Sequence, residues 1–385
     1  MADISDVIDP IVSAIFEQYE KKHGAEPARP YLGGSAIGKE CIRALWYDLR
    51  WSSPTEFDGR MYRLFQTGHL AEPRFVSDLR SIGATVWDCD PATGKQFSFS
   101  DHSGHMRGNL DAVAKNIPAG GSKPHLVEMK THSAKSFKEL KAKGVKAAKP
   151  QHYAQCMMYC GWAGLERALY LAVNKDTDEL YAERIEFDPV AFERLRAKAK
   201  TVIFSQEPPP KLSQDPSFYI CKFCSHRDVC HTHRVPPVSC RTCVHATPEL
   251  EGDGRWSCAI TGTPDPNINS IPIHVQRTGC PSHLPLPFLL TYADAIDAGE
   301  GWIEFKRHDN GAEFVVVANV PAGPAIAAAE CPAWFCEMAF GNWAVATTFG
   351  SAETQPAKAK AEVAVSARIA SVSTATHHRR QSRIF

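Results

Sequence analysis

The sequence lacks features that mark several classes of protein. Its 385 residues contain no apolar run approaching the ~20 residues that a membrane-spanning helix needs. The N-terminal Met-Ala-Asp-Ile-Ser-Asp is acidic and has no basic segment before an apolar stretch, so we expect a cytoplasmic protein without a signal peptide or a membrane partner. The pattern G-x-x-x-x-G-K-S/T is absent, which argues against an ATP-driven motor in this chain.

Charge of one sign is also missing, since 43 basic and 43 acidic residues give a formal net charge of zero. The average hides a local excess, because residues 130–149 hold seven lysines against the single acid Glu139. Such a run is typical of a solvated helix face, and it also suits a patch that binds a phosphate backbone. The candidates for backbone contact are Lys135, Lys138, Lys141 and Lys143.

Cysteine, by contrast, is plentiful and odd in number, with thirteen residues. In a reducing cytoplasm, cysteines act as metal ligands or free thiols more often than as disulfides. The sequence therefore predicts metal binding in preference to disulfide cross-links.

The hydrophobic pattern predicts an α/β protein. Apolar spacing and turn residues predict helices at 4–23, about 60–82, 133–143, 150–163 and 189–204. The intervening runs predict strands at 84–89, 95–100, 104–115, 124–131, 166–174 and 179–187. This order favours a mixed central sheet flanked by helices, within a domain spanning residues 1–234.

The C-terminal part has a different character. Residues 235–290 are rich in cysteine, proline and glycine and predict a small cysteine-rich module. Residues 291–350 form a small β-containing segment, with a hairpin predicted at 301–320 around Asp309-Asn310-Gly311. Residues 351–385 are rich in alanine, lysine, serine and threonine and are expected to be disordered.

Three charged residues form a candidate catalytic group. Asp111 and Glu128 lie on two runs predicted to be neighbouring strands, joined through the Gly120-Gly121 turn. Lys130 follows Glu128 by two residues, so strand alternation places both side chains on one face. Paired carboxylates hold Mg²⁺ or Mn²⁺, and a lysine stabilises developing charge. The alternative is an exposed face of salt bridges.

This arrangement resembles the core of the PD-(D/E)XK nucleases. His69, in Thr67-Gly68-His69-x-x-Glu72, and Gln155-x-x-x-Tyr159 are similar to the additional motifs of the RecB-type branch. The resemblance covers roughly residues 30–234 and implies a restriction-endonuclease-like fold. It implies that His69, Asp111, Glu128 and the Met129 carbonyl hold the metal, and that Gln155 and Tyr159 place the lysine and the substrate. Gln151 and His152 are rival candidates for substrate contact.

Four cysteines enclose this region. Cys41 precedes it, and Cys221, Cys224 and Cys230 follow with the spacing C-x2-C-x5-C. Thiolates in such a set suit zinc or iron–sulfur clusters. The order resembles that of iron–sulfur nucleases related to the AddB subunit and the CRISPR-associated adaptation nucleases. The resemblance implies a structural 4Fe–4S cluster that ties together distant parts of the chain.

A second cysteine set follows, made of Cys240, Cys243, Cys258 and Cys280. Its spacing fits a separate Zn²⁺ site, with nearby histidines as alternative ligands. Alternatively, Cys240 and Cys243 belong with the upstream set. The alternative histidine ligands are His231, His233, His245 and His283. The cysteines expected to be buried thiols are Cys89, Cys156, Cys160, Cys331 and Cys336.

The resemblance implies a metal-dependent DNA nuclease, specifically an exonuclease that processes DNA ends in recombination or repair. The organisation is similar to that of phage-encoded enzymes. The expected partners are DNA ends or single strands, with a recombinase, an annealing protein or a helicase. Two alternatives remain: a non-catalytic DNA-binding or assembly protein with a nuclease fold, and a redox iron–sulfur protein.

Overall fold

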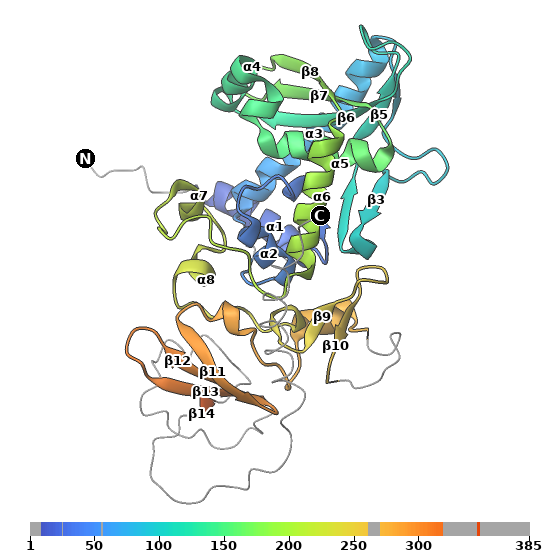
Figure 1. The fold of residues 1–385 in the computed structure, drawn as a ribbon. Helices are drawn as coiled ribbons and strands as arrows, with labels where there is room; N and C mark the ends of the chain where they lie inside the picture. Colours follow the sequence, from blue (N-terminus) through green and yellow to red (C-terminus); the bar gives the residue numbers. More distant parts are fainter. Residues whose placement is uncertain (1–8, 25, 55–56, 261–269, 319–344, 347–385) are drawn as a thin grey trace, which may run out of the picture. The chain divides into compact units, whose positions relative to one another are not determined.

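The computed structural model describes residues 9–24, 26–54, 57–260, 270–318 and 345–346 (Figure 1). The chain divides into two compact units, residues 1–226 with 247–271 and residues 227–246 with 272–385. Each unit is described by itself. The predicted tail at 351–385 and the cysteines Cys331 and Cys336 lie outside the described residues.

A five-stranded mixed sheet forms the centre of the first unit. Its order is β2-β5-β6-β7-β8, in which β6 and β7 run parallel and the other neighbours run antiparallel. The α/β prediction with a mixed central sheet is confirmed. The strands are β2 (Thr85–Trp87), β5 (Ala112–Lys115), β6 (His125–His132), β7 (Arg167–Asn174) and β8 (Leu180–Glu186).

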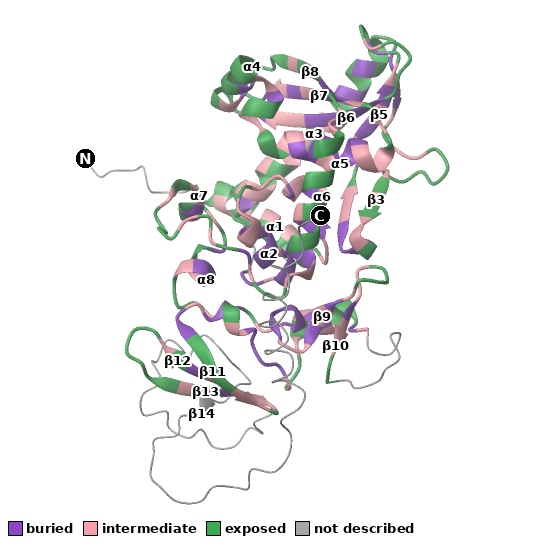
Figure 2. Ribbon diagram, viewed as in Figure 1, coloured by how far each residue is buried: buried purple, intermediate pink, exposed green. Residues whose placement is uncertain are grey.

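Helices cover both faces of this sheet. On one face, α3 (Gly59–Ser81) packs Phe75 and Leu79 against Val127 and Met129 of β6. On the other, α4 and α5 contact β6 and β7. Since alternate strand residues point to opposite faces, Glu128 and Lys130 lie beneath α4 and α5. Figure 2 shows the buried residues concentrated along β5, β6 and β7 and on the helices nearest them.

Local sequence explains where two of these helices begin and end. α5 (Pro150–Ala163) starts with a proline, whose missing N–H has no partner to lose in a first turn. Gly164 closes it in the left-handed conformation, with φ of 64°. α6 (Pro189–Phe204) is capped by the Asp188 carboxylate, which accepts hydrogen bonds from the next turn. Both predicted spans are confirmed.

The predicted strand at 104–115 is wrong in one respect, since the structure divides it. β4 (Met106–Asn109) pairs with β1 (Leu32–Gly33) and β3 (Ser98–Asp101) in a three-stranded sheet, whereas β5 joins the central sheet. Residues 106–109 and 112–115 both have a sequence typical of a strand, so the sequence does not show that they belong to different sheets. Asp111 lies at the point of transfer, directly before β5.

The second unit contains a four-stranded sheet of order β11-β12-β13-β14. Its β12–β13 pair is the hairpin predicted around Asp309, and its core holds the buried Phe305 stacked on Phe314 at 5.3 Å between ring centroids. The strands are β11 (Ala293–Gly299), β12 (Trp302–Arg307), β13 (Glu313–Val317) and β14 (Val345–Ala346).

The remaining described elements are short, apart from α1 and α4. None of the described helices is long and apolar enough to cross a lipid bilayer. They are α1 (Pro10–His23), η1 (Gly34–Ala36), α2 (Ile42–Arg50), η2 (His102–Gly104), α4 (Ala134–Ala148), α7 (Tyr219–Lys222), α8 (Arg227–His231), η3 (Cys240–Thr242), β9 (Ala246–Pro248), β10 (Trp256–Cys258), α9 (Ile273–Thr278) and η4 (Pro287–Leu289).

Candidate active site

The two candidate carboxylates lie at adjoining strands, with Asp111 directly before β5 and Glu128 on β6. β5 and β6 pair antiparallel with Ala112 opposite Val127, which brings Asp111 next to Glu128. The Asp111 Oδ2 atom accepts a hydrogen bond from the Met129 backbone N–H at 3.0 Å. This bond fixes the Asp111 side chain against β6, beside the strand that carries Glu128.

Glu128 is the most constrained group of the site. Its residue is 0% exposed, its Oε1 atom forms an ion pair with Lys130 Nζ, and its Oε2 atom is buried without a hydrogen-bond partner in the described structure. Burial, followed by the charges of Asp111 and Glu72, raises the pKa of Glu128 to about 7, although Lys130 opposes that rise. One oxygen of a buried carboxylate is therefore available to a ligand.

Lys130 projects from the same face of β6 as Glu128. Burial disfavours its charged form, but the Glu128 and Asp111 carboxylates outweigh this effect and raise the pKa of Lys130. Its side chain remains 25% exposed. A cationic ammonium group that reaches both a buried carboxylate and solvent suits contact with an anionic substrate.

Glu72 is a further candidate residue that sequence reasoning did not select. It lies on α3 one turn after His69, whose Nδ1 atom is 3.5 Å from Glu72 Oε1. Burial, followed by the Asp111 charge, raises the pKa of Glu72, although His69 and Lys130 oppose that rise. The i, i+3 spacing from His69 was the available signal. His69 itself has a 76% exposed side chain.

Tyr159 and Gln155 lie on α5, and both are buried. The Tyr159 ring contacts backbone that only glycine permits. A Cβ atom built on Gly108 of β4 would lie 2.5 Å from Tyr159 Cε1, and one built on Gly34 would lie 2.6 Å from the same atom. Burial, followed by the charges of Glu128 and Asp111, raises the pKa of Tyr159.

These residues fit a divalent cation in their chemistry. Three carboxylates, Glu72, Asp111 and Glu128, influence one another electrostatically, and Glu128 Oε2 is buried without a partner. Hard cations prefer such oxygen ligands and keep several waters. In the described part of the chain, however, no three His, Cys, Asp or Glu side chains are already gathered around one point as a ligand set. The roles predicted for His69 and the Met129 carbonyl stay predictions.

The first cysteine set is divided between the two units. Cys41, Cys221 and Cys224 belong to the first unit and Cys230 to the second. No disulfide links the cysteines that the structure describes. The iron–sulfur cluster therefore stays a prediction.

The second cysteine set is divided in the same way, with Cys258 in the first unit and Cys240, Cys243 and Cys280 in the second. Its zinc likewise stays a prediction. Of the five cysteines expected to be buried thiols, Cys156 and Cys160 are buried, and Cys89 is half-buried.

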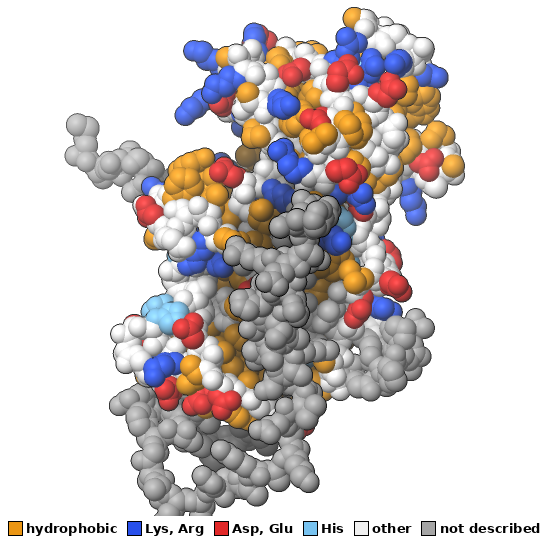
Figure 3. Space-filling view, in the orientation of Figure 1, with side chains coloured by type: hydrophobic (Ala, Val, Ile, Leu, Met, Phe, Trp, Pro, Cys, Tyr) orange, Lys and Arg blue, Asp and Glu red, His pale blue; other side chains and the backbone are white. Residues whose placement is uncertain are grey.

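The four candidate lysines all lie on α4, where basic side chains gather in Figure 3. Lys141 pairs with Glu179, and Lys143 pairs with Glu139 at 3.0 Å. Lys135 and Lys138 are exposed and have no ion-pair partner among the described residues. These two are therefore the more available for a phosphate backbone.

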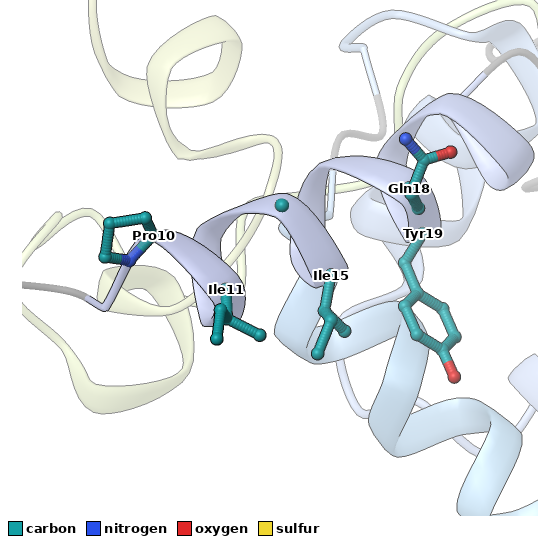
Figure 4. A pocket seen from close by; sticks show the side chains of 6 residues that line it. Pro10, Ile11, Ile15, Gln18 and Tyr19 are labelled. Carbon is teal, nitrogen blue, oxygen red and sulfur yellow. The ribbon is translucent and has the colours of Figure 1, made fainter.

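A shallow surface depression of about 530 Å³ lies apart from these residues. It is lined by the side of α1 that carries Pro10, Ile11, Ile15, Gln18 and Tyr19 (Figure 4). Its surface is almost entirely apolar and holds no carboxylate. The depression therefore contributes none of the chemistry of the candidate site.

Comparisons with known proteins give a limited result. No family model and no characterised protein matches the sequence. Among solved structures, that of SSO0001 has a TM-score of 0.35 and 14% identity, covering 58% of this chain and 96% of its own. LHK-Exo, an alkaline exonuclease from Laribacter hongkongensis, has a TM-score of 0.32 and 13% identity, covering 48% of this chain and 90% of its own. At these values the likeness carries no argument about activity.

Proposed function

We propose that the protein is a metal-dependent DNA nuclease, and specifically an exonuclease that acts on DNA ends. The observation that carries the proposal is the group around Glu128. A buried carboxylate with one free oxygen lies beside Asp111 and an ion-paired lysine at adjoining strands. A buried charge without a full set of partners is costly, and such groups are typical of catalytic sites.

The residues suit phosphodiester hydrolysis. Glu72, Asp111 and Glu128 would hold Mg²⁺ or Mn²⁺, which supplies charge neutralisation at the phosphate and a more acidic bound water. Lys130 donates hydrogen bonds toward the substrate and offsets negative charge that develops there. Met129 fixes Asp111 through its backbone N–H. Tyr159 and Gln155 form the wall that α5 contributes.

Variants of two residues test this assignment. Asp111→Asn keeps an oxygen for the Met129 N–H but removes the charge, and Lys130→Met keeps the stem but removes the ammonium. Each is expected to lower the rate of DNA degradation at least about a hundredfold, with an unchanged circular dichroism spectrum. Glu186→Gln is the matched control, since Glu186 is an exposed carboxylate on β8. Full activity in both site variants would disprove the assignment.

The second candidate function is a non-catalytic DNA-binding or assembly protein. The direct Glu128–Lys130 ion pair favours it, because it occupies one carboxylate oxygen that a metal would need. This alternative predicts tight DNA binding without cleavage in either Mg²⁺ or Mn²⁺. Cleavage that depends on the cation and on Asp111 would exclude it.

Further parts of the proposal concern cofactors and partners. We infer a metal site on Cys41, Cys221, Cys224 and Cys230 from the order and spacing of these thiols, and its assignment as a 4Fe–4S cluster comes from the resemblance to the iron–sulfur nucleases related to the AddB subunit. A Zn²⁺ ion on the second set follows from the same kind of spacing. DNA recombination or repair is the proposed setting, with a recombinase, an annealing protein or a helicase as the partner.

A further inference from the structure

A chain of hydrogen bonds lies on the catalytic face of the sheet, next to Lys130. His132 follows Lys130 by two residues on β6, so its side chain points to the same face. Tyr170 pairs with Glu128 across the parallel β6–β7 ladder and also points to this face. His152 reaches the same region from the first turn of α5.

The contacts join four side chains in sequence. Ser136 Oγ is 3.0 Å from His132 Nδ1, and His132 Nε2 is 2.9 Å from the Tyr170 hydroxyl. The same hydroxyl is 2.7 Å from His152 Nδ1. Tyr170 and His132 are buried, whereas His152 is half-buried. The middle of the chain is therefore buried, and its two ends, Ser136 and His152, are half-buried.

The Tyr170 hydroxyl has one proton, so with both rings neutral it donates to one of the two histidines and accepts from the other. Two arrangements satisfy all three contacts. In the first, Tyr170 donates to His152 Nδ1, His132 Nε2–H donates to Tyr170, and Ser136 donates to His132 Nδ1. In the second, every donor and acceptor is exchanged. Only the first arrangement leaves the second ring nitrogen of His152 with a proton to donate.

In the first arrangement, His152 presents a donor away from the chain. Its Nδ1 atom accepts from Tyr170, so the ring proton is on Nε2, a nitrogen for which no hydrogen bond to a described residue is found. Burial, followed by Lys130, His132 and Lys149, lowers the pKa of His152 to about 3, so the ring is neutral at neutral pH. The two lysines would attract an anion to this position.

We propose that His152 is a substrate-binding residue whose Nε2–H donates to a non-bridging phosphate oxygen of the DNA strand. Tyr170 and His132 are positioning residues that keep the proton on Nε2. The inference rests on the proposed nuclease function and adds a contact that the carboxylate–lysine group does not supply. A neutral donor suits a site that already holds the Lys130 charge.

Two amide replacements separate the halves of the His152 ring. The amide of glutamine extends to about the position of Nε2, and that of asparagine to about the position of Nδ1. His152→Gln therefore keeps the donor to the phosphate and loses the Tyr170 contact. His152→Asn keeps the Tyr170 contact and loses the donor to the phosphate.

The expected ranking in activity is the reverse of the ranking in stability. His152→Asn lowers kcat/KM by about 10- to 100-fold, the effect of one hydrogen bond to a charged oxygen, while His152→Gln keeps most of the activity. In thermal unfolding, His152→Asn is the more stable of the two. If activity follows stability instead, or if all variants match the parent, the proposal is overturned.

Measurements of the His152 tautomer and of DNA affinity test the role of His152 separately from the proposed nuclease activity. Long-range ¹H–¹⁵N correlation of the labelled parent protein should show His152 protonated on Nε2, and protonation on Nδ1 would contradict the proposal. If Asp111→Asn abolishes cleavage but the two His152 variants do not differ in activity as expected, the role of His152 is disproved and the proposed function is not. If the parent protein does not cleave, the same ranking is measured as affinity for a labelled oligonucleotide, and equal affinities overturn it.

Discussion

At the scale of single residues, the site depends on how Glu128 is buried. The Glu128 carboxylate is 0% exposed. It lies on β6, and Lys130 pairs with one of its two oxygens. The other oxygen has no partner in the described structure. Such an arrangement costs stability, since an incompletely paired buried charge is unfavourable. We infer that the protein tolerates this loss of stability because Glu128 takes part in the proposed cleavage reaction.

The neutral histidines of the Tyr170 chain predict a pH dependence of stability. Burial, then the charges of Lys149 and Lys130, lowers the pKa of His132 from 6.5 to about 4. Between pH 6.5 and 4, His132 is therefore protonated in the unfolded chain and neutral in the folded protein. Proton binding favours the unfolded chain in this range, so the free energy of unfolding decreases as the pH falls from 6.5 toward 4.

The comparison of the parent protein with His132→Gln measures this effect. Urea unfolding of both proteins at several pH values in this range should show a weaker pH dependence in the variant. The carboxylates contribute equally to both proteins and cancel in the comparison. Identical slopes would show that His132 titrates normally in the folded protein.

At the scale of elements, α5 packs closely against η1 and β4 because each of them has a glycine at the contact. Tyr159 lies against Gly34 and Gly108, whose backbones approach its ring more closely than a side chain would allow. Neither glycine has a positive φ, so the requirement comes from space and not from conformation. The position of Tyr159 is therefore set by two distant segments.

Replacement of Gly108 by alanine tests this fit. The added methyl group would overlap the Tyr159 ring, and we expect destabilisation by about 1–3 kcal/mol together with lower activity. Gly68→Ala in α3 is the matched control, because nothing lies within 4 Å of the added atom. That change should stabilise the helix by about 1 kcal/mol. Thermal unfolding measures both, and equal effects would contradict the fit.

The lysines of α4 give a second prediction at this scale. If they bind the phosphate backbone, replacing the two lysines without ion pairs, Lys135 and Lys138, with glutamine should lower the salt dependence of DNA affinity by about one unit per lost contact. The pair Lys141 and Lys143 should have a smaller effect, because each already pairs with a glutamate.

Fluorescence anisotropy at several salt concentrations measures this slope for the parent and both double variants. Equal slopes in all three proteins would assign the lysines to a solvated helix face. A larger effect of Lys141 and Lys143 would show that their ion pairs open when DNA binds.

The elements themselves were largely predictable, for local reasons. Pro150 and Pro189 start α5 and α6, and Gly164 ends α5, so sequence alone gives their bounds. The division of 104–115 was not predictable, because the choice of sheet depends on distant partners. The strand β11 was also missed, because its alanines and aspartates do not alternate as a strand pattern.

In the candidate site, too, local features could be predicted from the sequence and contacts between distant segments could not. Asp111, Glu128 and Lys130 were selected as candidates because the sequence predicts two strands joined by a local turn, and the structure places Asp111 directly before β5 and the other two on β6. The contact between His152 and Tyr170 was not found, since it depends on how β7 and α5 meet β6 and spans 18 residues.

At the scale of the whole molecule, the four cysteines of the first set come from segments that lie far apart in the chain. Cys41 precedes the central sheet, and Cys221, Cys224 and Cys230 follow it. A metal cluster on all four would close a long loop and remove much conformational freedom from the unfolded chain. The proposed cluster would therefore stabilise the whole fold, and its loss should lower the free energy of unfolding.

Cys41→Ser tests this role. Protein purified without oxygen should lose most of its iron and its brown colour, and its thermal unfolding midpoint should fall. Cys89→Ser, a half-buried cysteine outside both sets, is the matched control and should change neither property. Cys240→Ser should lose zinc and keep iron. Undiminished iron in Cys41→Ser would remove this residue from the ligand set.

The central claim is that Asp111 and Glu128 serve metal-dependent cleavage of DNA. Its most direct test is the release of nucleotides from end-labelled DNA by the parent protein and Asp111→Asn, with Mg²⁺, with Mn²⁺ and with a chelator. The account predicts release by the parent protein only when a cation is present, and none by the variant. A parent protein that binds DNA but releases nothing with either cation, or a variant as active as the parent, would contradict it.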